Sequence, residues 1–513
     1  MALLKTGDVE VRDYQKNIAK AASERSTLVV LPTGMGKTLI SVLVAVERLE
    51  KFPGTKVLIT APTRPLNAQH KKSFESLTSI PKGKIVLVTG KTPPHERAEM
   101  YDGATVVIAT PQTIENDLRE GRLNMRDFSF VTFDESHRGV KDYAYSDIAR
   151  KFMLQSRQPL VLALTASPGW TESKIKEVCK NLFIKAVEIR SESDGDVEEY
   201  VKPVDRDYVY VDFPEDFKRI RGLLQDVLKE DMEWLKSHHY VPTTIPSRTM
   251  LLGLQNRTAA RYSATKNYML IWPLIRSAEA IKLSHAIELI ETQGIPFLHE
   301  YFEKMKGSKK RTDQRLLKHG KIIDAIGLIE GLNDRDIDHP KTDKIREMVR
   351  DFVDKDPETK IIIFANFRST VDKIKKFLEK DGIPTETLVG QSMKNGSGMS
   401  QDEQIDVLKR FRDGKFNVLC GTSVSEEGID VPSVDYAIFH EAVPSEIRAI
   451  QRRGRIGRHS AGKAIFLITR GTRDEAYFFS SMNKERKMKK VLRDMKETGI
   501  VNKKRNLMDW ASD

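Results

Sequence analysis

Short runs of β-branched and apolar residues alternate with longer helix-forming segments over the first third of the chain. The apolar runs cover residues 28–31, 57–60, 85–88, 106–109, 131–133 and 160–164. A strand that is apolar along its whole length is typical of a parallel sheet buried on both faces, with helices between the strands covering those faces. The pattern predicts an α/β domain over residues 1–199.

The same alternation returns after Pro340, with apolar runs at residues 361–364, 418–420, 436–439 and 464–468. Just before the first of these runs, Ile345, Met348, Val349 and Phe352 lie at the spacing that places apolar side chains on one face of a helix. These features predict a second α/β domain over residues 340–483.

The segment between the two domains has one apolar run, residues 208–211, and otherwise shows helical spacing, as at Phe217, Ile220 and Leu224. It predicts a helical insertion over residues 200–339. Within it, residues 304–321 carry eight Lys or Arg against one acidic residue. That stretch is either a solvated loop or a loop that follows a phosphate backbone, and the sequence leaves both interpretations open. Residues 484–513 are predicted to form a basic C-terminal tail.

Composition excludes some classes of protein but does not by itself indicate a function. The chain of 513 residues is too long for one hydrophobic core. No apolar run approaches the roughly 20 residues of a membrane span, and the N-terminus lacks a signal pattern, so we expect a cytoplasmic protein without membrane association. Two cysteines, Cys179 and Cys420, make a disulfide framework or zinc cluster improbable. A net charge of +12 suits a nucleic-acid partner.

A phosphate-binding loop is the first chemical signal. Residues 33–38, Thr33, Gly34, Met35, Gly36, Lys37 and Thr38, follow an apolar strand and open a helix. Glycines allow a tight backbone whose amides face an anion, Lys37 would reach the β- and γ-phosphates, and the Thr38 hydroxyl would bind Mg²⁺. Leu31 stands where the full pattern has its first glycine. Alone, the motif could be an ordinary turn.

A carboxylate pair supplies the second signal, because Asp134 and Glu135 end the strand at residues 130–133. The carboxyl ends of strands in such a sheet are where ligands bind. Asp134 would hold Mg²⁺ through its water shell, and Glu135 would orient and deprotonate the attacking water. Asp134 alone could be a helix cap, which would not explain its occurrence together with Lys37.

An arginine block in the second α/β domain, residues 451–458, supplies the third signal. Arg455 and Arg458 belong to it. Alone, it could be a basic helix or a phosphate patch. Arginine neutralises charge in the transition state of phosphoryl transfer, so an arginine on the second domain would make hydrolysis depend on domain closure.

Taken in order, these motifs resemble the helicases of superfamily 2, and in particular the archaeal Hef and FANCM-type helicases. The resemblance rests on residues 33–38, 61–66, 89–90, 109–111, 134–137, 165–167, 363–368, 421–432 and 451–458, together with Arg12 and Gln15. It implies two RecA-like domains with the helical insertion between them, and ATP and Mg²⁺ as cofactors.

The resemblance also implies individual roles. Arg12 and Gln15 would recognise adenine, Asp430 would lie near the ribose, and Gln451 would lie near the γ-phosphate. His137, Thr165 and Ser167 would couple the ATP site to the nucleic-acid site. The residues implied to touch nucleic acid, without reading its sequence, are Arg64, Thr89, Thr110, Asn366, Gln391 and Thr422.

The function implied is an ATP-dependent DNA helicase or translocase that acts on forks and four-way junctions in repair, associated with the nucleoid of an archaeal-type cell. Replication and repair proteins are then candidate partners. An RNA-directed motor of the RIG-I or Dicer type is the alternative, because such motors carry an insertion at the same place. Hef-type proteins often continue into a nuclease, but here Glu485-Arg486-Lys487 is followed by Val491 where that signature has Asp. We therefore expect a helix surface there.

Overall fold

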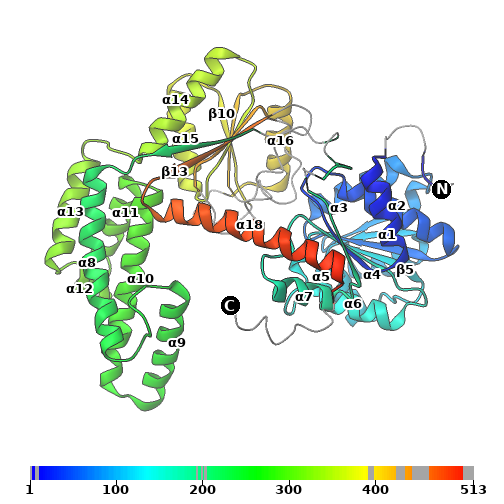
Figure 1. Ribbon diagram of the computed structural model, residues 1–513, viewed down its shortest axis with the longest axis horizontal. Helices are drawn as coiled ribbons and strands as arrows, with labels where there is room; N and C mark the ends of the chain where they lie inside the picture. Colours follow the sequence, from blue (N-terminus) through cyan, green and yellow to red (C-terminus); the bar gives the residue numbers. More distant parts are fainter. Residues whose placement is uncertain are drawn as a thin grey trace.

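The protein consists of two parallel sheets with a helical bundle beside the second of them, as the computed structural model shows (Figure 1). The structure describes residues 3–5, 11–191, 194–197, 200, 205–390, 398–422, 434–441 and 462–500. The predicted fold class is confirmed: two α/β domains with a helical insertion between them.

The first sheet has the strand order β3-β4-β2-β5-β6-β1-β7, with every neighbouring pair parallel. Its strands are β1 (Thr27–Val30), β2 (Lys56–Thr60), β3 (Ile85–Val88), β4 (Val106–Ala109), β5 (Phe128–Phe133), β6 (Val161–Thr165) and β7 (Ala186–Ile189). The apolar runs predicted the first six. β7 was missed because it is an edge strand whose burial alternates, so it lacks a continuous apolar run.

Helices cover both faces of this sheet. They are α1 (Asp13–Glu24), α2 (Lys37–Lys51), α3 (Arg64–Leu77), α4 (Pro94–Gly103), α5 (Pro111–Arg119), α6 (Ala144–Gln155) and α7 (Glu172–Asn181). Neighbouring strand residues enter opposite cores: Leu28 packs with Tyr145 and Phe152, whereas Val29 packs with Tyr14 and Phe74. Burial on both faces explains why the strands read as unbroken apolar runs.

The second sheet has the order β10-β11-β9-β12-β13-β8 and is also parallel. It contains β8 (Asp205–Val211), β9 (Ile361–Phe364), β10 (Thr385–Leu388), β11 (Val418–Gly421), β12 (Tyr436–Phe439) and β13 (Lys463–Thr469), with α14 (Pro340–Lys355), α15 (Arg368–Lys380) and α16 (Gln401–Arg412) around it. β8 precedes the insertion in sequence, so the predicted division at residue 200 is too early. The apolar run at residues 208–211 marked the second half of β8, whereas the polar first half of this edge strand gave no sign of its place in the second sheet.

The insertion is a helical bundle with its own core. It comprises α8 (Glu215–Ser237), α9 (Arg248–Thr265), α10 (Ile271–Thr292), α11 (Ile295–Lys306), α12 (Arg311–Leu316) and α13 (Gly320–Asn333). The core is apolar, with members such as Phe217, Leu224, Ile290 and Phe302. The amphipathic spacing that predicted helices here therefore reflects burial against neighbouring helices.

Residues 304–321 are mostly helical, so the expected loop shape was wrong, whereas contact of this stretch with a phosphate backbone stays a prediction. Met305 and Leu316 pack into the bundle core. Carboxylates outside the stretch pair with some of its cations: Lys304 lies 2.5 Å from Glu300, and Lys321 lies 3.0 Å from Asp226. Part of the positive charge in the sequence window is therefore matched by acidic residues from outside it.

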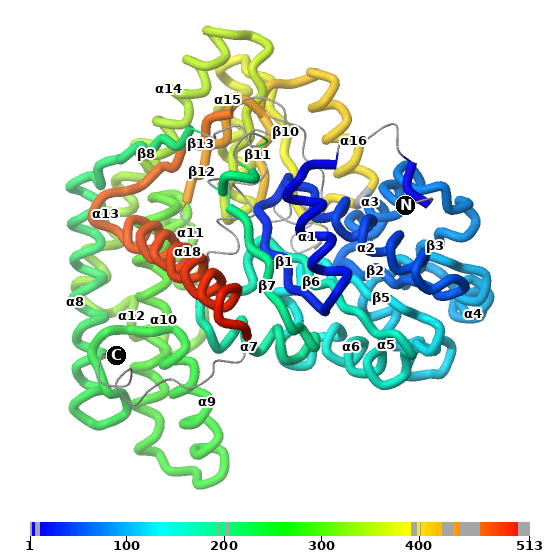
Figure 2. The backbone as a smooth tube through the Cα atoms, turned by 45° about the vertical axis from the view of Figure 1, so that its right-hand side comes forward, coloured from blue at the N-terminus to red at the C-terminus, as the bar shows by residue number. Residues whose placement is uncertain are grey.

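One long helix, α18 (Arg473–Thr498), crosses from the second domain to the first, and both views show this path (Figures 1 and 2). It contacts β13 and α10 as well as β7 of the first sheet. Met488, Leu492 and Met495 join a core of the first domain, and Lys496 pairs with Glu188 at 2.9 Å. Residues 484–498 are therefore a docked helix, which corrects the predicted division at residue 484; residues 501–513 lie outside the described part of the chain.

A fully buried ion pair joins the starts of α14 and α18. Lys341 Nζ donates to Asp474 Oδ2 at 2.6 Å and to the carbonyl oxygen of His440 at 2.5 Å. The backbone N–H of Thr469 also donates to Asp474 Oδ2, at 3.0 Å. Neither side chain of the pair is exposed to solvent. Removing one partner of such a pair leaves a buried charge without compensation.

We predict that Lys341→Met lowers the opening free energy of β12, β13 and the start of α18 by about 3–5 kcal/mol. Hydrogen–deuterium exchange of the corresponding peptides measures this. The matched control is Lys344→Met on the same helix, where Lys344 pairs with Glu347 at the surface and removal should cost under about 1 kcal/mol. Equal exchange in the two variants would contradict the role given to the buried pair.

Candidate functional site

The phosphate-binding loop lies between β1 and α2, and α1 holds it in shape. Gly34 and Gly36 have φ angles of 89° and 74°, in the left-handed region that favours glycine. A Cβ atom at residue 36 would lie 2.2 Å from Gln15 Nε2. The Met35 carbonyl accepts hydrogen bonds from the Tyr14 hydroxyl at 2.9 Å and from Gln15 Nε2 at 3.2 Å. The left-handed φ favours glycine at position 36, and any larger residue there would displace the Gln15 amide of α1 from its hydrogen bond with the loop.

Two polar groups of the loop are placed for a phosphate. Lys37 begins α2, and its Nζ donates to the carbonyl oxygens of Leu31 at 3.0 Å and Pro32 at 3.3 Å. Thr33 Oγ1 is buried and has no hydrogen-bond partner among the described residues. The positive end of the α2 dipole faces the same point. The loop can therefore accept an anion with little rearrangement of its backbone.

Arg12 and Gln15, the predicted adenine readers, lie together at the start of α1. The backbone N–H of Arg12 donates to Gln15 Oε1 at 3.1 Å. The Arg12 guanidinium lies 5.3 Å from the centre of the Tyr200 ring. The structure thus brings both residues next to the phosphate-binding loop through the Gln15 contact with Met35.

Asp134 and Glu135 follow β5 at the carboxyl edge of the same sheet. Asp134 Oδ2 lies 2.9 Å from His70 Nε2, and its Oδ1 accepts the Glu135 N–H at 2.9 Å. Burial alone would raise the pKa of Asp134, but the hydrogen bond from His70 and the charges of His70 and Lys37 lower that pKa overall. The Tyr145 hydroxyl also donates to the Asp134 carbonyl at 2.6 Å. Asp134 is therefore kept ionised, as a Mg²⁺ ligand must be.

A line of short contacts leads from Glu135 to α18. His137 Nδ1 lies 3.3 Å from Glu135 Oε2 and 3.2 Å from Thr165 Oγ1. Thr165 Oγ1 donates to the Ser167 carbonyl at 3.1 Å, and Ser167 Oγ donates to Met488 Sδ at 3.0 Å. The three residues predicted to couple the sites are therefore in direct contact, and the contacts extend to a helix that the sequence did not connect with the site.

The predicted nucleic-acid contacts of the first domain follow adjacent strands. Arg64 begins α3 after β2, Thr89 follows β3, and Thr110 precedes α5 after β4. Arg64 is exposed. Its Nη2 would lie 3.9 Å from a Cβ atom at Gly90, so two of the motifs meet at this edge. Because β3, β4 and β2 are neighbours in the sheet, these residues form one row.

Two of the nucleic-acid contacts predicted for the second domain, Asn366 and Thr422, lie in the described part of the chain. Asn366 follows β9 and is exposed, whereas Thr422 follows β11 and is 5% exposed, its backbone N–H donating to the Leu388 carbonyl at 3.2 Å. The remaining predictions for this domain fall outside the described residues: Gln391, Asp430, Gln451, Arg455 and Arg458. Their roles stay predictions.

The residues around the loop fit a nucleoside triphosphate with Mg²⁺. The tight glycine loop, the buried Thr33 hydroxyl and the ionised Asp134 supply an anion site beside a carboxylate. In the described part of the chain, no group of three His, Cys, Asp or Glu side chains could hold a metal by itself. Mg²⁺ is usually held by one or two carboxylates together with substrate phosphates, so the ionised Asp134 beside an anion site suits that ion.

Sequence reasoning missed three residues of the site: His70, Tyr145 and Met488. Each reaches the site from a different helix, His70 from α3, Tyr145 from α6 and Met488 from α18. Nothing local marks them, because a single His or Tyr on the buried face of a helix is normally part of the core.

Comparison with known proteins identifies the chain. The crystal structure of the Pyrococcus furiosus Hef helicase domain superimposes with a TM-score of 0.73 at 43% sequence identity, covering 94% of this chain and 100% of that one. This chain belongs to the Hef family of superfamily 2 helicases. Family models for the DEAD/DEAH box helicase and the helicase conserved C-terminal domain match residues 12–175 and 341–460 of the Hef-family chain. A helical bundle model of ATP-dependent RNA helicases matches residues 216–329.

Curated relatives of this Hef-family protein include helicases with differing names. A Methanocaldococcus jannaschii protein, provisionally named an ATP-dependent RNA helicase, is 42% identical over 96% of this chain and 62% of its own length. The ATP-dependent DNA helicases fml1 of Schizosaccharomyces pombe and mph1 of Neurospora crassa are each 32% identical, over 90% and 91% of this chain. The chain spans 57% and 42% of those two proteins. No helix among the described residues is long and apolar enough to cross a membrane.

The His70 contact gives a pH-dependent prediction for this Hef-family ATPase. A carboxyl whose pKa is lowered by folding contributes stability above its unfolded pKa and loses it as pH falls through the folded value. His70→Leu removes a main cause of the lowering, so Asp134 protonates at higher pH. We expect the acid limb of the ATPase pH profile to move to higher pH. The control is His95→Leu, whose side chain is 80% exposed on α4; an unmoved limb in His70→Leu would contradict the assignment.

Proposed function

We propose that this chain is an ATP-driven DNA motor that acts on branched DNA, such as forks and four-way junctions. The observation that carries the proposal is the line of contacts from Glu135 through His137, Thr165 and Ser167 to α18. This line joins the proposed hydrolysis site to a helix that also contacts β13 of the second domain. The names of the S. pombe and N. crassa relatives, both ATP-dependent DNA helicases, favour DNA over RNA.

We assign the roles at the ATP site by position. Lys37 and the loop amides bind the phosphates, and Arg12 and Gln15 hold the base. Thr38 and Asp134 would hold Mg²⁺, which neutralises phosphate charge when bound. Glu135 orients the attacking water and accepts its proton. Asp430, Gln451, Arg455 and Arg458 would act from the second domain, so hydrolysis requires the two sheets to close on one nucleotide.

The nucleic-acid path runs along the carboxyl edges of both sheets. Arg64, Thr89 and Thr110 would contact one part of the phosphate backbone, and Asn366, Gln391 and Thr422 another. Such contacts carry no sequence information, so binding depends on the shape of the DNA.

The helical insertion adds a basic face to this path. Residues 234–278 contain six Lys or Arg and no Asp or Glu. Four of these cations, Arg248, Arg257, Arg261 and Lys266, are exposed on or just after α9. A helix with exposed cations and no acidic residue in its segment suits contact with phosphates. Because α9 lies in the insertion and not on either sheet, it would give the chain a second place to hold DNA, as contact with two arms of a branched DNA requires.

An RNA-directed motor is the second candidate. The M. jannaschii relative carries the name of an RNA helicase, and the helical bundle model belongs to RNA helicases. A clamp that uses ATP only as a structural ligand is a third candidate, disfavoured because nothing in a clamp requires Glu135 and the arginine block.

The nucleic-acid preference is tested by a panel of matched forks, four-way junctions, linear duplexes and single strands, in DNA and in RNA. We expect branched DNA to give the greatest stimulation of ATP hydrolysis, about tenfold over no nucleic acid. Stimulation by RNA duplexes equal to or above that by DNA would favour the RNA motor. No stimulation by forks or junctions would reject the branched-DNA proposal.

The hydrolytic role of Glu135 is tested by Glu135→Gln. We expect turnover to fall by roughly 10²- to 10⁴-fold, because a general base is lost, with ATP affinity changed by less than about threefold. The surface variant Glu177→Gln is the control. Arg458→Ala should likewise lower turnover far more than ATP binding, because a finger arginine acts on the transition state. Normal turnover in Glu135→Gln would remove Glu135 from the role of base.

A further inference from the structure

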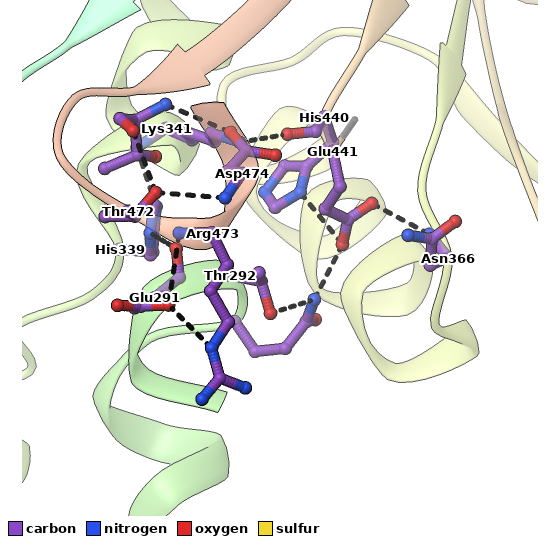
Figure 3. Close-up of polar contacts among 12 residues, drawn as sticks. Glu291, Thr292, His339, Lys341, Asn366, His440, Glu441, Thr472, Arg473 and Asp474 are labelled. Atoms are coloured by element: carbon purple, nitrogen blue, oxygen red, sulfur yellow. Dashed lines mark hydrogen bonds and ion pairs between the residues drawn. The ribbon is translucent and has the colours of Figure 1, made fainter. Parts of the chain in front are cut away.

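A buried glutamine fixes the end of α10 to the second domain. Gln293 directly follows α10 and is 3% exposed. Its Nε2 donates to Glu441 Oε1 at 2.6 Å, and its Oε1 accepts a hydrogen bond from the Thr370 hydroxyl of α15 (Figure 3 shows the surrounding contacts). Both ends of this one amide are thus bonded to the second domain.

Glu441 extends the connection to the loop after β9. The carboxylate is 2% exposed, and its second oxygen accepts the backbone N–H of Asn366 at 2.9 Å. His440 Nδ1 lies 3.2 Å from the first oxygen. Burial alone would raise the pKa of Glu441, but His440, the Gln293 hydrogen bond and the charge of Lys341 lower it to about 2. An ionised carboxylate therefore lies between the insertion and Asn366, as Figure 3 shows.

Close packing around Gly294 also restricts the junction. Gly294 has a φ of 91°, and a Cβ atom there would lie 2.8 Å from the His339 backbone nitrogen. His339 Nε2 lies 3.1 Å from the Glu291 carbonyl oxygen. The entry to α11 and the entry to α14 are therefore pressed against each other, which leaves the end of α10 little freedom to move.

Apolar side chains would be enough if the junction only had to hold the insertion and the second domain together. Burying a carboxylate and an amide costs desolvation, which the interior repays only when their geometry is well satisfied. Here the junction is held by directional hydrogen bonds. The last of them joins Glu441 to the backbone N–H of Asn366, whose side chain is exposed at the edge of the sheet. Directional bonds fix an angle between two bodies, which apolar packing does less well.

We propose that Gln293 and Glu441 are positioning residues that set the insertion and the Asn366 loop in one fixed relation, so that both hold the same nucleic acid as one body. The inference rests on the proposed function only for the nucleic-acid grip. The fixed relation itself is a property of the protein alone.

The fixed relation is tested by spin-label distances in the absence of nucleic acid. Labels are placed at Lys229→Cys on α8 and Lys409→Cys on α16, both exposed positions, while the native Cys179 and Cys420 are buried. We expect a narrow distance distribution in the parent protein. Gln293→Met removes both hydrogen bonds of the amide, and Thr370→Val removes one of them. Each variant nearly preserves side-chain size, and each should broaden the distribution.

The matched control is Thr385→Val, another buried threonine of the second domain, whose hydroxyl donates to the Ile383 carbonyl away from the junction. It should leave the distribution narrow. Unchanged distributions in both junction variants would overturn the proposal. Thr370→Val keeps the test valid if Gln293→Met does not fold.

The grip is tested by the same variants in nucleic-acid-stimulated ATP hydrolysis. We expect the fork concentration for half-maximal stimulation to rise about tenfold in Gln293→Met, with turnover without DNA and turnover at saturating DNA unchanged. Broadened distances with an unchanged half-maximal concentration would also overturn the proposal. If forks stimulate neither the parent nor any variant, the proposed function fails while the distance measurement still decides the fixed relation.

Discussion

The pairing of β8 with β13 is the constraint on which the second half of the molecule depends. β8 lies before the insertion in sequence and the rest of its sheet lies after it, so the sheet is complete only when the chain leaves for the bundle and returns. Lys341 and Asp474 then fix the point of return, and Gln293 and Glu441 fix the end of α10. The bundle is therefore attached to the second sheet at several points and cannot swing on one linker.

The helix α18 carries this arrangement to the first domain. It begins beside the buried Lys341–Asp474 pair and ends against β7, with Met488 on Ser167. Ser167 is two residues from Thr165, which is in contact with the His137 next to Glu135. A change at Glu135 can thus be transmitted through these contacts to α18, the helix that also contacts α10 of the insertion. Such a route couples two sites only if α18 has two positions, one for each state of the ATP site.

Much of the fold could be predicted because its central strands are buried on both faces. β1 and β5 read as apolar runs for that reason, whereas β7 did not, since an edge strand keeps one side polar. The phosphate loop and the Asp134-Glu135 pair were also predictable, because their chemistry lies in consecutive residues. His70 and Tyr145 were not, because they contact Asp134 from the buried faces of two helices, where such residues are normally part of the core. The roles of Arg455 and Arg458 rest on the motif alone.

The central claim is that the insertion moves with the second sheet while the first sheet closes on ATP. Two fluorescence distance pairs measure this most directly, one between exposed positions on α4 and α16 and the other between α8 and α16. On adding a non-hydrolysable ATP analogue with forked DNA, the account predicts that the α4–α16 distance shortens and the α8–α16 distance stays constant. A changed α8–α16 distance, with or without closure of the sheets, would contradict it.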